Sequence, residues 1–241
     1  MLNFDQFERF NWKSNQEQYT QLSNFFNNSS QLEIRKIIDI ILKYYGITFD
    51  ETELSFLGSG TYGFAFLMKN PEIKDEIVLK ITTDRDEYIN ALKIVNKNTK
   101  YIAYHYDARK VVGIEYESKV KNIKENYYVI LLEKVKLLSK EILNDIDILS
   151  TFWRKNGRSS IDLVQYLNMN NFENITEEDA IKYLMDFDNI QKESHKFGVP
   201  LIDIHSENLG IKDNHLIWFD VGIGAIDEDD IEQEPININL K

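Results

Sequence analysis

The stretch Leu54-Ser-Phe-Leu-Gly58-Ser-Gly60-Thr-Tyr-Gly63-Phe-Ala-Phe-Leu-Met68 decides between two folds. Its glycines form a Gly-x-Gly-x-x-Gly motif, which can also announce a dinucleotide-binding fold. In that fold a helix must follow the glycines, so that its N-terminus faces the pyrophosphate. Here alternating apolar residues follow, with two aromatics and no helix start, which is a strand pattern. The stretch therefore predicts a strand-loop-strand hairpin whose backbone N–H groups lie over a phosphate chain.

The next apolar run, Glu76-Ile-Val-Leu-Lys80-Ile, predicts a strand with a lysine near its end. Lys80 stands 17 residues after Gly63 (80 − 63 = 17). Most strand lysines point to solvent. This spacing is about what a hairpin and one further strand need to bring an ammonium group under the glycine loop.

A lysine in a cleft needs a carboxylate partner. Three acidic residues, Asp84, Asp86 and Glu87, open the helix that follows. Glu87 is the best candidate because it shares the buried face of that helix with Ala91 and Leu92. Acidic residues in a first turn are also favoured by the helix dipole alone.

A second polar cluster lies far downstream, in Asp203-Ile-His205-Ser-Glu-Asn208 and in the Asp220-Val-Gly222 that follows an apolar run. Clusters of this kind are often plain turns. Here Asp203 is suited to accept a proton from a hydroxyl. Asn208 and Asp220 supply the oxygen ligands that Mg²⁺ prefers.

The order of these motifs resembles the protein-kinase-like superfamily, most of all the compact serine/threonine kinase domains encoded by bacteriophages. The catalytic loop of that superfamily reads His-Arg-Asp-x-x-x-x-Asn and its metal motif Asp-Phe-Gly. The resemblance covers about residues 53–225. It implies a two-lobed α+β fold, with a small antiparallel sheet and one main helix in the N-lobe and a helical C-lobe. It also implies ATP and Mg²⁺ as cofactors.

The resemblance assigns a role to each site residue. Lys80, held by Glu87, would position the α- and β-phosphates of ATP under the glycine loop of Gly58, Gly60 and Gly63. Asn208 and Asp220 would bind the metal, and Asp203 would take the proton of a serine or threonine hydroxyl. His205 would contact the γ-phosphate. The carbonyl of Glu133 and the N–H and carbonyl of Val135 would face the adenine edge at a hinge.

Three departures from the family pattern change the expectations. Leu201 and Ile202 replace the His-Arg before the catalytic Asp, so we expect activity without activating phosphorylation. Val221 replaces the Phe whose packing often sets an inactive state. Only 19 residues follow Gly222 (241 − 222 = 19), which leaves no room for the large helical subdomain of typical eukaryotic kinases.

We expect three regions: a helical extension at 1–50 packed on the first lobe, an N-lobe at 51–135, and a minimal C-lobe at 136–241. The extension includes a helix that ends at Gly46, in a left-handed cap. Strand-like runs occur at 101–106, 111–116 and 127–132. In the second lobe, helices are expected at 139–153, at 161–167 and after Thr176, which opens a capping box.

Composition limits the partners and the compartment. A net charge of −12 argues against nucleic acid or an anionic membrane as a partner. The sequence has no cysteine and no long apolar segment, so we expect a cytoplasmic protein, in the host cytoplasm if it is viral. The expected partner is a protein substrate, with host proteins among the candidates, and the chain could also phosphorylate itself.

Two alternatives stay open at this point. The chain could be a pseudokinase that serves as an interaction module, although every catalytic position is filled. It could also be a small-molecule kinase of the aminoglycoside or choline type, which shares the Asp-x-His turn. Those enzymes build their substrate pocket largely from helices after the metal Asp, which this chain lacks, although residues 139–175 could substitute.

Overall fold

The computed structural model describes residues 23–26, 30–46, 53–70, 73–117, 124–156, 172–222 and 233–238. They form two compact units. Unit 1 holds the described residues up to 96, His105–Lys134 and 233–238, and unit 2 holds Lys97–Tyr104 and the described residues from 135 to 222. The chain passes to unit 2 after Lys134, next to the expected lobe boundary. Two short segments cross that boundary: Lys97–Tyr104 belongs to unit 2, and residues 233–238 belong to unit 1.

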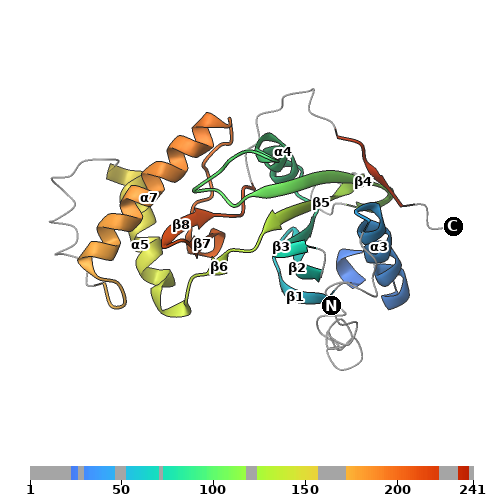
Figure 1. The fold of residues 1–241 in the computed structure, drawn as a ribbon, viewed down its shortest axis with the longest axis horizontal. Coiled ribbons are helices and arrows are strands. Elements are labelled where there is room, and N and C mark those ends of the chain that lie inside the picture. Colours follow the sequence, from blue (N-terminus) through green and yellow to red (C-terminus); the bar gives the residue numbers. More distant parts are fainter. Residues whose placement is uncertain are drawn as a thin grey trace. The chain divides into compact units, whose positions relative to one another are not determined.

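Unit 1 is built on a six-stranded sheet of order β1-β2-β3-β5-β4-β9 (Figure 1). Its strands are β1 (Glu53–Ser59), β2 (Gly63–Asn70), β3 (Ile73–Thr82), β5 (Lys124–Glu133), β4 (His105–Glu117) and β9 (Ile236–Asn237). The first five pair antiparallel, and β9 runs parallel to β4. The α+β class is confirmed. The sheet is mixed rather than antiparallel throughout, because the tail adds a parallel edge strand.

One face of this sheet is covered by helix α3 (Gln31–Tyr44). A capping box of Ser30 and Glu33 opens the helix, and Gly46, with φ +69°, ends it as predicted. Residues before 23 lie outside the described part of the chain. The shared core consists of Phe26, Ile34, Ile37, Ile38, Ile41 and Leu42 with Leu54, Phe64, Phe66, Met68, Ile77, Leu79, Ile81, Val111, Tyr127, Val129, Leu131, Ile236 and Ile238.

Helix α4 (Arg85–Ile94) contacts β4 and β5 and packs on the face of the sheet opposite to α3. Successive side chains of a strand point to opposite faces. Leu79 and Ile81 of β3 belong to the core under α3, so Lys80 between them points toward α4. The ring of Tyr88 on α4 stacks on that of Tyr128 on β5, with centroids 4.6 Å apart.

The prediction of separate strands at 101–106 and 111–116 is wrong, because β4 is one strand that begins at His105. Residues just before it bond elsewhere: Ala103 N–H donates to the Trp218 carbonyl at 2.8 Å, within unit 2. The strand continues through Gly113, whose φ of +94° lies in an irregular part of the pairing with β5. The glycine therefore marks a distortion within β4 rather than a break between strands.

Unit 2 contains the helices α5 (Lys140–Asn156) and α7 (Glu177–Lys196) and the 3-10 turn η2 (Ser206–Asn208). A small sheet joins β6 (Lys136–Leu137), β7 (Leu209–Lys212) and β8 (His215–Trp218). Thr176 and Asp179 form the predicted capping box. The helix expected at 161–167 falls outside the described residues. Among the helices that are described, none combines the length and apolarity needed to cross a membrane.

Candidate functional site

The three loop glycines differ in what their surroundings require. Gly60 N–H donates to the Gly63 carbonyl at 2.9 Å and closes the turn between β1 and β2. A Cβ on Gly63 would lie 2.3 Å from the Ile81 carbonyl oxygen, so strand packing alone demands glycine there. A Cβ on Gly58 or Gly60 would meet no atom within 4 Å. The backbone at these two positions is therefore open to the close approach of a ligand.

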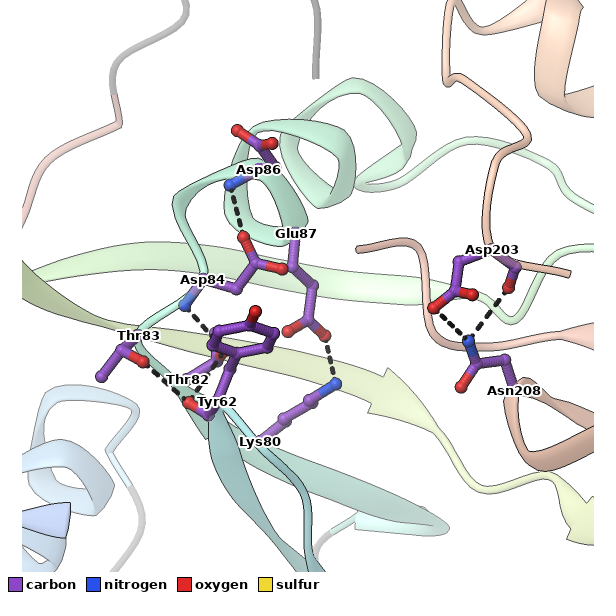
Figure 2. Close-up of polar contacts among 9 residues, drawn as sticks. All are labelled: Tyr62, Lys80, Thr82, Thr83, Asp84, Asp86, Glu87, Asp203 and Asn208. Atoms are coloured by element: carbon purple, nitrogen blue, oxygen red, sulfur yellow. Dashed lines mark hydrogen bonds and ion pairs between the residues drawn. The ribbon is translucent and has the colours of Figure 1, made fainter. Parts of the chain in front are cut away.

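The tip of the glycine loop is tied to the start of α4 (Figure 2). The Tyr62 carbonyl accepts hydrogen bonds from Thr83 N at 2.8 Å, Thr83 Oγ1 at 3.1 Å and Thr82 Oγ1 at 3.3 Å. Thr82 Oγ1 in turn accepts from Asp84 N at 3.0 Å, and the Asp84 side chain caps α4 by accepting from Asp86 N at 2.9 Å. Sequence reasoning missed the two threonines, whose only signal was a pair of hydroxyls at the end of a strand.

Lys80 and Glu87 form an ion pair, with Lys80 Nζ 2.5 Å from Glu87 Oε1 (Figure 2). The lysine side chain is 20% exposed and the glutamate side chain 5%. Water screens such a pair poorly, and its geometry holds both groups in place. The structure brings Lys80 to Glu87, as expected from the buried face of the helix, while the Asp86 backbone bonds to the helix cap.

In unit 2, Asp203 and Asn208 are joined directly (Figure 2). Asn208 Nδ2 donates to the Asp203 carbonyl at 3.0 Å and to Asp203 Oδ2 at 3.1 Å. Nδ2 is the donor in both bonds, so Oδ1 is the side-chain atom of Asn208 that could act as a metal ligand. His205 Nε2 lies 3.5 Å from Asp203 Oδ1, and both side chains are 36% exposed. The turn presents a carboxylate, an imidazole and an amide oxygen together.

The β7–β8 hairpin sets the backbone of Asn208 beside that of Phe219, the residue before Asp220. Leu209 pairs with Trp218 at the end of the hairpin, and Phe219 N–H donates to the Asn208 carbonyl at 3.1 Å. Asn208 directly precedes β7, and Asp220 follows β8 by one intervening residue. Both predicted metal ligands therefore belong to the same end of the hairpin.

The side-chain oxygens of Asn208 and Asp220, at this end of the hairpin, are of the kind that binds Mg²⁺. The described residues contain no group of three His, Cys, Asp or Glu side chains that could hold a metal. Mg²⁺ commonly binds one or two carboxylates and completes its shell with phosphate oxygens and water. Asn208 Oδ1 and the Asp220 carboxylate would provide two hard oxygen ligands of this type.

The predicted residues divide between the units. Unit 1 contains Gly58, Gly60, Gly63, Lys80, Glu87 and Glu133, and unit 2 contains Val135, Asp203, His205, Asn208 and Asp220. Glu133 is the last residue of β5, and Val135 directly precedes β6. The expected hinge residues therefore flank the point where the chain leaves unit 1.

Sequence reasoning also missed a contact to the Asp203 turn. Asp147 on α5 accepts a hydrogen bond from Ser206 N at 2.8 Å through Oδ1, and from Ser206 Oγ at 2.9 Å through Oδ2. The two residues are 59 positions apart, and nothing in either local sequence signals the pairing.

No family model matches the chain, and the search of curated proteins finds no match either. The functional assignment therefore depends on the residues and their geometry.

Proposed function

We propose that this chain is a Mg²⁺- and ATP-dependent phosphotransferase with a two-lobed protein-kinase-like fold, and that it phosphorylates serine or threonine hydroxyls of proteins. The observation that carries the proposal is the partly buried Lys80–Glu87 ion pair, on the sheet whose β1–β2 loop has open backbone at Gly58 and Gly60. A cation held in this way is suited to bind phosphate oxygens.

In this proposal the groups of unit 1 bind ATP. Backbone N–H groups of the glycine loop cover the phosphates, and Lys80 Nζ contacts the α- and β-phosphates. Glu87 fixes the lysine, because a side chain with four rotatable bonds otherwise samples many positions. The Glu133 carbonyl and the backbone of Val135 hydrogen-bond to the adenine edge.

The groups of unit 2 act on the transferred phosphate and its acceptor. The Asp203 carboxylate accepts a hydrogen bond from the incoming hydroxyl and takes its proton as the oxygen attacks. His205 donates to the γ-phosphate. Asn208 and Asp220 hold the metal, which when bound neutralises phosphate charge. Since phosphoryl transfer depends mainly on positioning and charge stabilisation, these few groups suffice.

Activity is proposed to need no phosphorylation of the chain itself. The positions before Asp203 are Leu201 and Ile202, and Ile202 is 51% exposed. Neither side chain can bind a phosphate on a regulatory segment. We propose a cytoplasmic site of action and protein substrates, with a host protein as the substrate if the chain is viral.

The test is transfer of labelled phosphate. Purified protein is incubated with Mg²⁺, γ-³²P-labelled ATP and a heat- and phosphatase-treated bacterial protein extract, beside an Asp203→Asn control. Asn retains an oxygen that can accept from Asn208, so the turn is kept while the base is lost. We expect labelled phosphoserine or phosphothreonine, on extract proteins or on the chain itself, reduced about 10²–10⁴-fold in the control.

Three other outcomes would contradict the proposal. Equal labelling by wild type and Asp203→Asn would exclude Asp203 as the base. No phosphate transfer, above all together with no thermal shift with Mg²⁺-ATP, would indicate a pseudokinase. ADP release with kanamycin or choline, without protein labelling, would indicate a small-molecule kinase.

A further inference from the structure

Apart from Asp179 in the Thr176 cap, four described carboxylates on helices α5 and α7 accept hydrogen bonds from backbone amides of other segments. Their partners are Asn174 N for Asp145, Ser206 N for Asp147, Leu216 N for Asp186, and the amides of Lys100, Tyr101 and Ile102 for Glu193. Three of these contacts anchor segments outside the Asp203 turn. Asp147 is the described carboxylate outside residues 203–208 that accepts hydrogen bonds from the turn joining Asp203 to Asn208.

The contact between Asp147 and Ser206 is bidentate. One carboxylate oxygen accepts the Ser206 N–H at 2.8 Å and the other accepts the hydroxyl at 2.9 Å. Ser206 is 2% exposed, so water could replace these bonds only if the turn moved. Two bonds to one planar carboxylate restrict both the position and the orientation of the serine.

The other hydrogen bonds of the turn stabilise its conformation, but they do not fix its position relative to the rest of unit 2. Asn208 binds Asp203 through its side chain and donates through its N–H to the His205 carbonyl at 3.0 Å. All of these bonds stay within residues 203–208. Among the described residues, the hydrogen bonds that link the turn to the rest of unit 2 are the Phe219 N–H on the Asn208 carbonyl and the two bonds to Asp147, while the buried side chain of Ile204 adds apolar packing.

We infer that Asp147 is a positioning residue for phosphoryl transfer, which orients Asp203 and His205 through Ser206. This inference depends on the proposed function. Among the described residues, the side-chain hydrogen bonds of Asp147 go to Ser206, and not to a group assigned to adenine or to the α- and β-phosphates. Its loss should therefore lower kcat and leave the KM for ATP nearly unchanged. Displacement of a reacting group by about 1 Å can lower a rate about 10²-fold.

The experiment compares Asp147→Ala with Asp145→Ala, measuring kcat and KM for ATP with dephosphorylated casein as acceptor. Asp145 is a matched control on the same helix, because it is 1% exposed and holds a different loop amide. We expect kcat to fall about 10–100-fold in Asp147→Ala and less than about twofold in Asp145→Ala, with KM for ATP within about twofold in both. If Asp147→Ala does not fold, Ser206→Ala removes only the hydroxyl, and kcat should fall severalfold.

Hydrogen exchange of the Ser206 amide in the same variants separates this inference from the proposed function. Exchange should accelerate in Asp147→Ala and not in Asp145→Ala, whether or not phosphate is transferred. If the wild type transfers no phosphate, the proposed function fails while the exchange data still report the contact. If the wild type is active and Asp147→Ala keeps its kcat, or loses no more than Asp145→Ala, the positioning role is overturned.

Discussion

Replacing Lys80 by methionine would leave the Glu87 carboxylate without its lysine at a site where the glutamate side chain is only 5% exposed. Breaking a fully buried pair on one side costs about 3–5 kcal/mol. The carboxylate can instead take up a proton. The ordinary pKa of a glutamic acid lies about 2.7 pH units below 7, and each pH unit corresponds to about 1.36 kcal/mol, so protonation at pH 7 costs about 3.7 kcal/mol. Because the lysine side chain is one-fifth exposed, some water can enter, so we expect a loss of about 2–3 kcal/mol.

Urea unfolding of three variants measures this. Lys80→Met should lose about 2–3 kcal/mol at pH 7, and the loss should shrink toward pH 4 as the carboxylate is protonated. The double variant Lys80→Met/Glu87→Met should lie within about 1 kcal/mol of wild type, because both charges of the pair are removed together. Lys134→Met breaks the exposed pair with Glu76 and should cost less than about 1 kcal/mol.

Lys80→Met should also abolish the thermal shift with Mg²⁺-ATP. Ligand binding should stabilise the wild type by about 2.7 kcal/mol at a ligand concentration 100 times Kd. The proposed role of this pair is refuted if Lys80→Met costs no more than Lys134→Met, or if the double variant is no more stable than Lys80→Met.

Substitutions test three further contacts. Gly63→Ala should destabilise unit 1 by about 1–3 kcal/mol in urea unfolding, because its Cβ meets the Ile81 backbone, whereas Gly58→Ala should cost much less; equal costs would contradict the close approach of β2 to β3 at Gly63. Thr82→Val should cost about 1–2 kcal/mol and raise the KM for ATP, since the fully buried hydroxyl links the glycine loop to α4. An unchanged KM would show that this link does not affect ATP binding by the loop. Hydrogen bonds from the Thr176 side chain and backbone lower the pKa of Asp179, so its contribution to stability is present at neutral pH and lost as the pH falls through that lowered pKa. The Tm deficit of Asp179→Asn at pH 7 should therefore narrow below about pH 4, and a constant deficit would argue against the capping bond.

Local patterns predicted much of unit 1. The glycine hairpin and the choice of Glu87 followed from alternation, helical spacing and motif order, because the residues concerned are neighbours along the chain or on one helix. The Thr176 capping box was predictable for the same reason, since its two partners are three residues apart. Such signals depend on short-range geometry, which the sequence displays directly.

Contacts between distant segments were not predictable. The tail strand β9 has two residues, too few to show alternation, and its parallel pairing with β4 joins residues more than a hundred positions apart. Asp145 and Asp147 are acidic residues of the same helix, and the local sequence does not distinguish them. The fold shows that Asp147 is the one that accepts hydrogen bonds from Ser206. The segment before His105 has strand-like composition, yet its backbone bonds with Trp218, so tertiary pairing overrides local propensity.

The central claim is that one ATP molecule is bound by the groups of unit 1 while Asn208 and Asp220 hold its metal. A crystal structure with a non-hydrolysable ATP analogue and Mn²⁺ in place of Mg²⁺ tests it most directly, since anomalous scattering locates the ion. We expect Lys80 Nζ at hydrogen-bonding distance from the α- and β-phosphates, and the ion bound by Asn208 Oδ1 and Asp220 at distances near the value of about 2.1 Å for Mg²⁺. A nucleotide bound away from Lys80, or an ion that contacts neither Asn208 nor Asp220, would contradict it.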